Sequence, residues 1–391
     1  MTEQTVIEAT VTNRLPGAPL VVHGLHSRPG PDEPLAIPPG ETRSVSFTAG
    51  KPGTYFYWAT TTGSVIVRPP RPAGGRRGAT ANSAGGVGAP AAAPARTGRD
   101  TTLSGAFIVD PTGTAANRDR VFVITELFER AGGGTAPLAE GEPIGQNAFM
   151  VAINGKSWPH TERLTYRAGD SIRWRWINSG AGPHPMHLHG FHYLVESKGD
   201  VGSDKIYTEA ERRTVVTENM AAGTTMTMQW QPQRPGNWLF HCHLLGHIAA
   251  DIKVDPSHAA HHGGNHATEA MAGLVLGINV LPVKGARVEP PPSHAAKELT
   301  LVIRELPKHY GDRSAYGFAL QQGASEPGDA QISIPGPPLL LTKGELTSIK
   351  VINHLTVETS VHWHGIERPI GPESIRRWRR RSRQADCSRR G

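Results

Sequence analysis

One short segment combines cysteine and histidine at a spacing that suits metal binding. Residues 241–243 read His-Cys-His, and His247 follows the cysteine by five residues. Alternate residues on a strand face opposite sides, so the thiol of Cys242 points one way and the flanking imidazoles point the other. One thiolate with two imidazoles is the ligand set of electron-transfer copper sites. The segment can therefore serve two metal sites at once, joined by a short covalent path.

Two further segments supply imidazoles. Residues 184–190 read HPMHLHG, which places His187 and His189 on one face and His184 three residues upstream. Residues 362–365 read HWHG. Taken singly, such a segment is often a pair of surface histidines, and a lone cysteine is most often a small buried apolar residue. Together, the three segments indicate a metal centre.

These segments occur within an internal repeat. Residues 169–190 and 344–365 each contain an alternating stretch that ends in Ile-Asn, with histidines nine and eleven residues after the asparagine. A third copy, residues 10–26, places His23 ten residues after its asparagine, with Val21 at a ligand position. Alternation of this kind is typical of half-buried strands. We therefore predict three β-sandwich domains, each built around one copy of the repeat.

The repeats set the expected domain boundaries. The domains are predicted at residues 1–114, 115–256 and 300–367, with a disordered insertion rich in Gly, Ala, Pro and Arg at 69–100. Residues 257–299 are expected to form a His-rich linker. Residues 368–391 are Arg-rich and lack a strand pattern, so we interpret them as an aberrant tail that cuts the third domain in half.

Composition excludes several classes of protein. The net charge is +7, but nine of the 41 basic residues and two of the 34 acidic residues lie in 368–391, which leaves 32 of each in the rest of the chain. A neutral body argues against a nucleic-acid partner. No apolar run is long enough to span a membrane, and no signal peptide is visible at the N-terminus. Two cysteines, Cys242 and Cys387, do not suggest a disulfide framework.

The three histidine segments resemble three of the four copper-binding signatures of multicopper oxidases, the family of laccases, ascorbate oxidase and ceruloplasmin. The resemblance covers most of residues 1–367. It implies an all-β fold of tandem cupredoxin-like Greek-key β-sandwich domains. It also implies a copper-dependent oxidoreductase that takes electrons from phenols, aromatic amines or metal ions and reduces O2 to water. The resemblance further implies a periplasmic or secreted location. It leaves open whether the protein forms an oligomer.

The resemblance assigns each ligand to one of three kinds of copper. The expected ligands are His184, Cys242 and His247 for the type 1 blue copper, His187 and His362 for the type 2 copper, and His189, His241, His243 and His364 for the type 3 pair. In this family pattern, Cys242, His241 and His243 also carry electrons from the blue copper to the three-copper cluster.

The chain departs from the family pattern in three places. The fourth signature, a second His-x-His in the third domain, is absent. In the first domain Trp58 and Thr60 stand where histidines would, which leaves His23 and His26 as remnants of a lost copper site. The axial position of the blue copper falls on Ile252, where a residue that does not coordinate should raise the reduction potential.

Two other functions remain open on the sequence. One is a copper-binding protein without turnover, either a copper sink or a degenerate fragment. The other is copper nitrite reductase, which is less favoured because histidines on both sides of Cys242 indicate a cluster that reduces oxygen.

The ligand count gives the first prediction. Eight of the ten histidines in the family pattern are present, so each type 3 copper lacks one imidazole. Metal retention depends on the number and geometry of the ligands. We expect residues 1–391 to bind fewer than four coppers per chain and to reduce oxygen slowly with laccase dyes. Elemental analysis and oxygen uptake check this. Four coppers with rapid uptake would refute it and would point to ligands from a neighbouring subunit.

Overall fold

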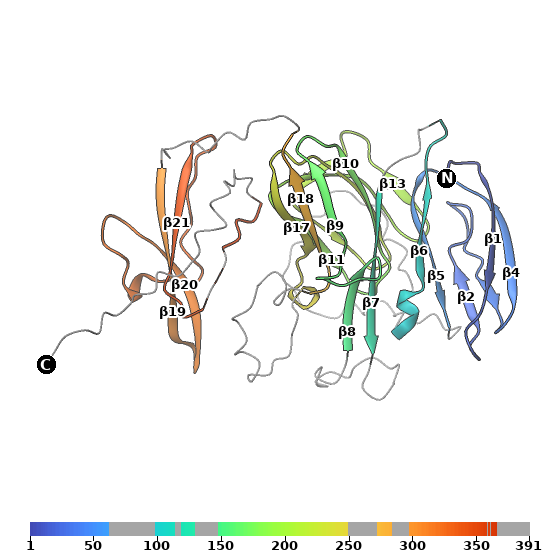
Figure 1. The fold of residues 1–391 in the computed structure, drawn as a ribbon, viewed down its shortest axis with the longest axis horizontal. Helices are drawn as coiled ribbons and strands as arrows, with labels where there is room; N and C mark the ends of the chain where they lie inside the picture. Colours follow the sequence, from blue (N-terminus) through green and yellow to red (C-terminus); the bar gives the residue numbers. More distant parts are fainter. Residues whose placement is uncertain are drawn as a thin grey trace, which may run out of the picture. The chain divides into compact units, whose positions relative to one another are not determined.

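The computed structural model describes residues 1–61, 98–113, 119–129, 148–248, 272–283, 297–357, 359 and 361–365. The described residues divide into two compact units, residues 1–284 with Gly365 and residues 285–364, which are described separately. Nearly all regular structure is β-strand, which confirms the predicted all-β class (Figure 1). No helix in the described ranges is long and apolar enough to cross a membrane.

The N-terminal part of the first unit contains two small sheets. One pairs β1 (Val6–Thr12) with β4 (Thr42–Thr48). The other has the strand order β3 (Leu35–Ile37), β2 (Leu20–His23), β5 (Gly53–Thr60), β6 (Ser104–Val109). Exposure alternates along β1, as expected for a strand with one face on the core. A short 3₁₀ turn, η1 (Gly98–Thr102), precedes β6.

The middle part of the first unit is a two-sheet sandwich. The larger sheet has the order β13 (Asp204–Ile206), β12 (Tyr193–Gly199), β16 (Thr225–Trp230), β10 (Ile172–Asn178), β7 (Arg120–Glu129), β8 (Ala148–Ile153), and β14 (Arg213–Val215) also pairs with β12. The smaller sheet has the order β15 (Thr217–Met220), β11 (His184–Leu188), β17 (Gly236–Cys242), β18 (Val275–Leu281), β9 (Arg163–Arg167). The copper-signature histidines of this unit lie on or just after strands of the smaller sheet.

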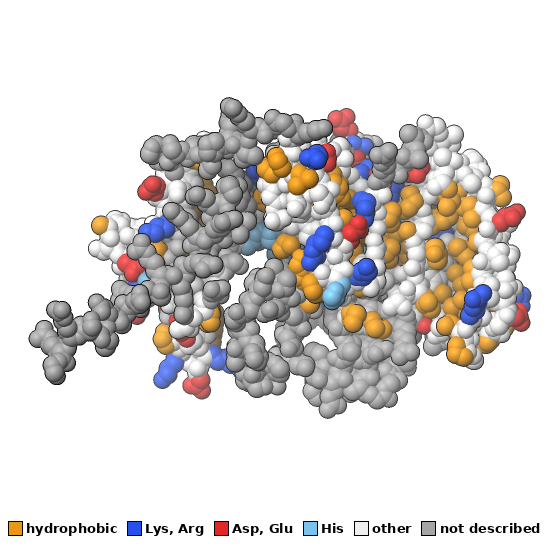
Figure 2. Space-filling view, viewed as in Figure 1, with side chains coloured by type: hydrophobic (Ala, Val, Ile, Leu, Met, Phe, Trp, Pro, Cys, Tyr) orange, Lys and Arg blue, Asp and Glu red, His pale blue; other side chains and the backbone are white. Residues whose placement is uncertain are grey.

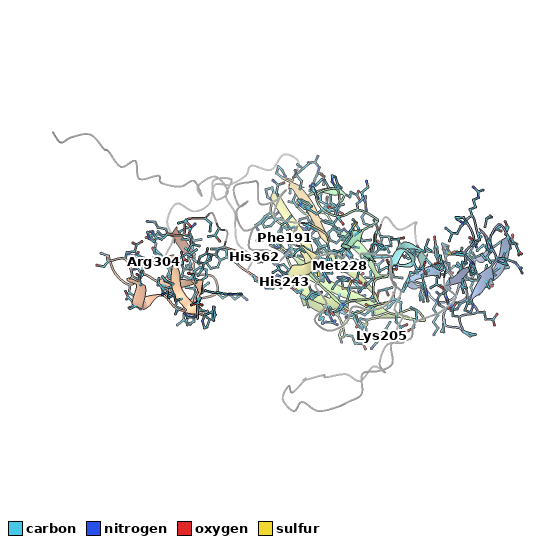
Figure 3. The ribbon with its side chains drawn as sticks, turned by 90° about the horizontal axis from the view of Figure 1, so that it is seen from below. Phe191, Lys205, Met228, His243, Arg304 and His362 are labelled. Carbon is cyan, nitrogen blue, oxygen red and sulfur yellow. The ribbon has the colours of Figure 1, made fainter. Side chains whose placement is uncertain are left out.

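An aromatic cluster holds the two sheets of the sandwich together. Trp174 and Trp176 project from β10 and are fully buried. Phe240 of β17, in the other sheet, lies 4.9 Å from the ring of Trp176 and 5.2 Å from that of Trp174. Phe191, which is labelled in Figure 3, extends the cluster. Its ring centroid lies 4.7 Å from that of Trp238. Burying such rings stabilises the sandwich by area and by edge-to-face contact, and it anchors β17 two residues before Cys242.

A buried arginine joins the N-terminal sheets to the sandwich. Arg175 of β10 is 4% exposed, and its guanidinium contacts Asp119 at 2.7 Å and Asp110 at 2.9 Å. It also donates to the Thr54 hydroxyl of β5 at 3.0 Å. Asp110 and Thr54 belong to the N-terminal part, whereas Arg175 belongs to the sandwich. The two parts therefore share one buried ionic network, and this agrees with their grouping as one compact unit.

Some expected boundaries need correction or lie outside the described residues. The predicted linker at 257–299 contains β18, which pairs with both β17 and β9, so the linker prediction is wrong for Val275–Leu281. The apolar pattern VLGINVL is that of a buried strand, and it follows directly on the His-rich stretch. Most of the predicted insertion at 69–100 lies outside the described residues, although its end begins η1. The tail at 368–391 also lies outside them.

The second unit has one three-stranded sheet in its described residues. The order is β20 (Arg313–Leu320), β19 (Lys297–Tyr310), β21 (Thr347–Asn353), with a short turn, η5 (Asp329–Gln331). Leu301, Val302 and Ile303 of β19 are buried and form the centre of this sheet. The parallel pairing of β19 with β21 leads the chain into the HWHG segment.

On the face drawn in Figure 2, basic and acidic side chains intermingle rather than form a region of one sign.

The network around Arg175 gives the second prediction. Removing the guanidinium takes the buried partner away from Asp110 and leaves Asp119 with Arg173. Losing one member of a buried ion pair costs about 3–5 kcal/mol. We expect Arg175→Ala to lower the free energy of unfolding by that amount, measured by urea titration of tryptophan fluorescence. Arg43→Ala is the control, because Arg43 and Glu41 form an exposed pair worth at most about 1 kcal/mol. Equal effects of the two substitutions would contradict this account.

Candidate metal centre

Three predicted ligands converge in the middle sandwich. Cys242 Sγ lies 3.8 Å from His184 Nδ1 and 3.6 Å from His247 Nδ1, and the two Nδ1 atoms are 3.1 Å apart. All three ligand atoms lie within 4.8 Å of one another, close enough to surround one ion. The set of one sulfur and two imidazole nitrogens fits the trigonal arrangement of blue copper sites. These residues therefore fit the copper that the sequence analysis assigned to them.

Strand pairing brings these distant residues together. In the antiparallel register of β11 and β17, Met186 lies opposite Cys242 and His187 lies opposite His241. His184 at the start of β11 then lies beside the end of β17. The 3₁₀ turn η3 (Leu245–His247) follows and bends the chain back, which returns His247 to the cysteine. The backbone N–H of Leu244 points at Cys242 Sγ from 3.4 Å, and such a donor favours the thiolate form.

Burial controls the chemistry of the thiol. Cys242 and His184 are both 0% exposed. Burial raises the pKa of the Cys242 thiol to about 11, and the N–H of Leu244 offsets this only in part. The pKa of His247 is lowered by burial and by the neighbouring His184. At neutral pH the thiol is thus protonated until a cation takes the place of its proton.

A carboxylate that the sequence analysis missed contacts this centre. Glu126 of β7 is 8% exposed, and its Oε1 lies 3.0 Å from His184 Nε2. Burial raises the pKa of Glu126, but the contact with His184 and the N–H of Ala181 outweigh it and bring the pKa below its ordinary value. A signal existed in the sequence: Phe122, Ile124 and Glu126 share the inward face of β7, where an acid is unexpected.

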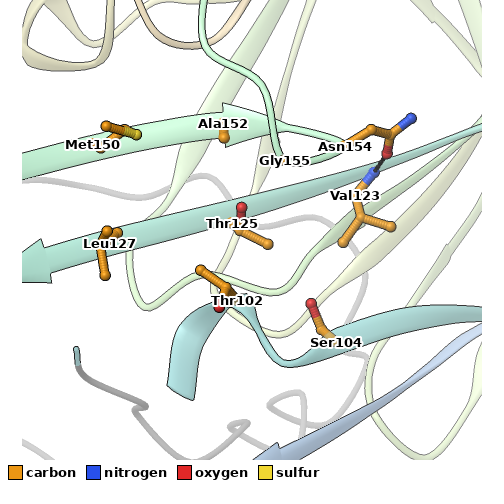
Figure 4. Close-up of a pocket in the computed structure, with 9 residues that line it drawn as sticks. All are labelled: Thr102, Ser104, Val123, Thr125, Leu127, Met150, Ala152, Asn154 and Gly155. Carbon is orange, nitrogen blue, oxygen red and sulfur yellow. Dashed lines mark hydrogen bonds between the residues drawn. The ribbon is translucent and has the colours of Figure 1, made fainter. Parts of the chain in front are cut away.

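The opposite face of β7 lines a cavity. The side chains of Val123, Thr125 and Leu127 point away from Glu126, as alternation along a strand requires. With neighbouring residues they enclose a cavity of about 270 Å³, drawn in Figure 4. The full set of lining residues is Thr102, Ser104, Val123, Thr125, Leu127, Met150, Ala152, Asn154 and Gly155. The cavity is thus separated from the thiol–imidazole centre by the thickness of one strand.

Four more predicted ligands gather on the other side of the cysteine. The His189 and His241 Nε2 atoms are 2.7 Å apart, and the rings of His187 and His243 are centred 4.9 Å from each other. Figure 3 labels His243. His187 Nδ1 lies 2.7 Å from the carbonyl of Val216, so it carries the proton and leaves Nε2 for a metal. His241 Nδ1 has the same relation to the carbonyl of Cys242, at 2.7 Å. The expected separation of the thiol from the flanking imidazoles is present.

The remaining predicted ligands belong to the second unit. His362 and His364 follow β21, and their rings are centred 5.5 Å apart. Both are on a segment without regular structure. The two histidines thus form a local pair, as the motif predicted, and their assignment to the type 2 and type 3 coppers stays a prediction. Ile252, at the expected axial position, lies outside the described residues.

The histidines of the first domain have structural partners. His23 is 7% exposed, its Nδ1 lies 2.8 Å from Asp32, and its ring stacks on Trp58 at 5.1 Å with an interplanar angle of 4°. The Asp32 carboxylate also lies 3.6 Å from His26. Trp58 thus fills the space beside His23. These contacts support the interpretation of the first domain as one without a copper site, which stays a prediction.

Comparisons with known proteins find a similarity to multicopper oxidases over two ranges of the chain. Two family models, both described as multicopper oxidase, match residues 138–255 and 330–373. The first range contains the whole thiol–imidazole centre and the four-histidine cluster, and the second contains His362 and His364. Over these two ranges the chain is similar to multicopper oxidases. This confirms the resemblance and makes copper the cofactor for which the histidine clusters are built.

Similar proteins include ceruloplasmins and laccases. Rat ceruloplasmin (Rattus norvegicus) is 33% identical over 105 residues, 26% of this chain and 9% of the relative. Laccase-12 of rice (Oryza sativa subsp. japonica) is 34% identical over 83 residues, 19% of this chain and 14% of the relative. The chain thus matches only a small part of these curated relatives.

Solved structures of similar fold include a blue copper oxidase from Nitrosomonas europaea, with a TM-score of 0.46 and 20% identity. The match covers 71% of this chain and 74% of that chain. A copper nitrite reductase from Nitrosomonas europaea has a TM-score of 0.42 and 18% identity, and the match covers 72% of this chain and 81% of that chain.

The buried thiol gives the third prediction. Copper binds the thiolate, and the Cys242 thiol is protonated below a pKa of about 11, so binding releases its proton. The apparent association constant should therefore rise by about tenfold per pH unit from about pH 7 to pH 9. Competition with a chelator of known protonation measures it. Cys242→Ser has no thiol proton to release, and its weaker binding should depend far less on pH. A flat wild-type profile would contradict the prediction.

Proposed function

We propose that this protein is a copper-dependent oxidoreductase that removes electrons from a small reducing substrate and passes them to O2. Phenols, aromatic amines and low-valent metal ions are the proposed substrate class. The observation that carries the proposal is the position of Cys242 between two ligand sets. Its thiol faces His184 and His247. The adjacent His241 belongs to the four-histidine cluster, whose other members are His187, His189 and His243.

The residues divide the work in a way that suits stepwise electron transfer. When bound, copper supplies the redox chemistry, accepting single electrons at one site and reducing oxygen at the other. The chain holds the ligands in a fixed geometry through the β11–β17 pairing. It excludes water from the Cys242 thiol, which is fully buried. Cys242 and His241 are neighbours in the chain, so a single peptide bond links the two ligand sets. Their connection therefore needs no conformational change.

Two alternatives are weighed against this proposal. A copper nitrite reductase would also use a thiol and two imidazoles, but the histidines on both sides of Cys242 and their contacts with His187 and His189 favour a multinuclear oxygen site. A copper-binding protein without turnover would hold metal at the same residues. Oxygen uptake separates it from the oxidase.

The proposal gives the fourth prediction. Copper-loaded protein should show the intense visible thiolate-to-copper absorption band, and Cys242→Ser should abolish both the band and any oxygen uptake with a phenolic reductant. The reason is that serine oxygen cannot replace the thiolate in covalency or softness. His26→Gln is the control, because His26 is outside both ligand sets, and it should leave band and turnover unchanged. A colourless wild type at full copper occupancy would refute the blue copper assignment. A band without oxygen uptake would favour the copper-binding alternative.

A further inference from the structure

We propose that Glu126 is a positioning residue for the blue copper site: it fixes the tautomer and orientation of His184, and its negative charge lowers the reduction potential of the bound copper. The part of the proposal that concerns the reduction potential rests on the proposed function. The part that concerns the His184 tautomer does not, because the tautomer is a property of the metal-free protein.

The contact between the two residues is direct and isolated. Glu126 Oε1 and His184 Nε2 are 3.0 Å apart. Neither atom has a partner in hydrogen-bond geometry among the described residues, so this approach is an ion-pair contact and not an aligned hydrogen bond. Both side chains are buried, Glu126 at 8% exposure and His184 at 0%. A buried carboxylate with no partner would carry a large desolvation cost. Two lone pairs 3.0 Å apart would repel each other, so a proton on Nε2 that faces Oε1 is the arrangement this distance favours.

The other carboxylate oxygen is held by a glycine-containing loop. The backbone N–H groups of Ala181 and Gly182 donate to Glu126 Oε2 at 2.9 and 3.2 Å. A side chain at Gly180 would place its Cβ 2.8 Å from Glu126 Cδ, and one at Gly182 would place it 3.0 Å from Oε1. The loop before β11 thus leaves space for this carboxylate and clamps it with two donors. Glu126 has one position available, with Oε1 directed at the histidine.

The clamp decides which nitrogen of His184 is free for the metal. An ionised carboxylate only accepts hydrogen bonds, so His184 must carry its proton on Nε2. Its Nδ1 is then a bare lone pair, directed at Cys242 Sγ and His247 Nδ1. The opposite tautomer would place a proton on Nδ1, where the copper must bind. Carboxylates that orient ligating histidines in this way are worth about 10–100-fold in metal affinity.

Glutamine at position 126 reverses this arrangement without changing its size. The two N–H donors of the loop demand the amide oxygen, and the NH2 group is then directed at His184 Nε2. A donor in that position requires Nε2 to be the acceptor, so the proton moves to Nδ1. Loss of the negative charge also removes an interaction that favours the more highly charged cupric state.

The experiment compares the full-length chain with Glu126→Gln, using nitrogen NMR of isotope-labelled histidine in the metal-free protein. Wild-type His184 should show the Nε2–H tautomer and Glu126→Gln the Nδ1–H tautomer. Copper affinity should fall about 10–100-fold in the variant, and the reduction potential of the remaining blue copper should rise. Glu196→Gln is the matched control, because Glu196 is equally buried at 8% but pairs with Arg173. It should change neither tautomer, affinity nor potential.

A purely structural role for Glu126 would alter stability and leave the tautomer and the potential as they are, and that result would overturn the proposal.

Where Glu126→Gln fails to fold, Gly182→Ala provides the test, since its Cβ would displace Oε1 and keep the charge. It should weaken copper binding, whereas Gly202→Ala, with its nearest atom at 3.7 Å, should not. Unchanged affinity in Gly182→Ala also overturns the proposal. Absence of a blue band in the wild type would instead refute the proposed function, while the NMR result still decides the role of Glu126.

Discussion

The antiparallel pairing of β11 with β17 is the constraint on which the metal centre depends. Its register puts Met186 opposite Cys242 and His187 opposite His241, although these residues are more than 50 positions apart in the sequence. Because side chains alternate along each strand, this one register sends the thiol to one site and the imidazoles beside it to another. A shift by one residue would exchange the two faces and disperse both ligand sets. The aromatic cluster of Trp174, Trp176 and Phe240 holds β17 in that register.

The electrostatics of the site follow from the same burial. A thiol at 0% exposure has its pKa raised, and the imidazole beside it at His247 has its pKa lowered. Both shifts favour neutral groups in a dry interior, which costs little in the absence of metal. Glu126 is the exception, a charge kept in that interior by two backbone donors and one imidazole. The centre is therefore prepared for a cation: its ligands are uncharged until the metal arrives, and one anion is already in place.

Much of the site could be predicted from the sequence, because the ligands occur in dense local motifs. The distances among His184, Cys242 and His247 agree with that prediction, as does the face shared by His187 and His241. The parts that could not be predicted depend on contacts distant in sequence. Glu126 lies 58 residues before its histidine in a strand that looks ordinary except for one inward acid. The strand β18 is short and apolar, and its place in the sheet depends on pairing with β17 and with the distant β9. The partners of Arg175 become visible only when β5, β6 and β10 are packed together.

The network around Arg175 limits how modular this chain can be. The N-terminal sheets carry Trp58 and Thr60 at ligand positions and so contribute nothing to metal binding in the expected pattern. They nevertheless provide two of the three partners of the buried Arg175 guanidinium: the Asp110 carboxylate, which neutralises it, and the Thr54 hydroxyl, which accepts a hydrogen bond from it. In a shortened protein that kept only the copper-binding sandwich, the Arg175 guanidinium, now buried, would be exposed to solvent. The N-terminal part thus supplies a counter-charge and a cover for Arg175, and a version of this protein without residues 1–110 would need a replacement for Arg175.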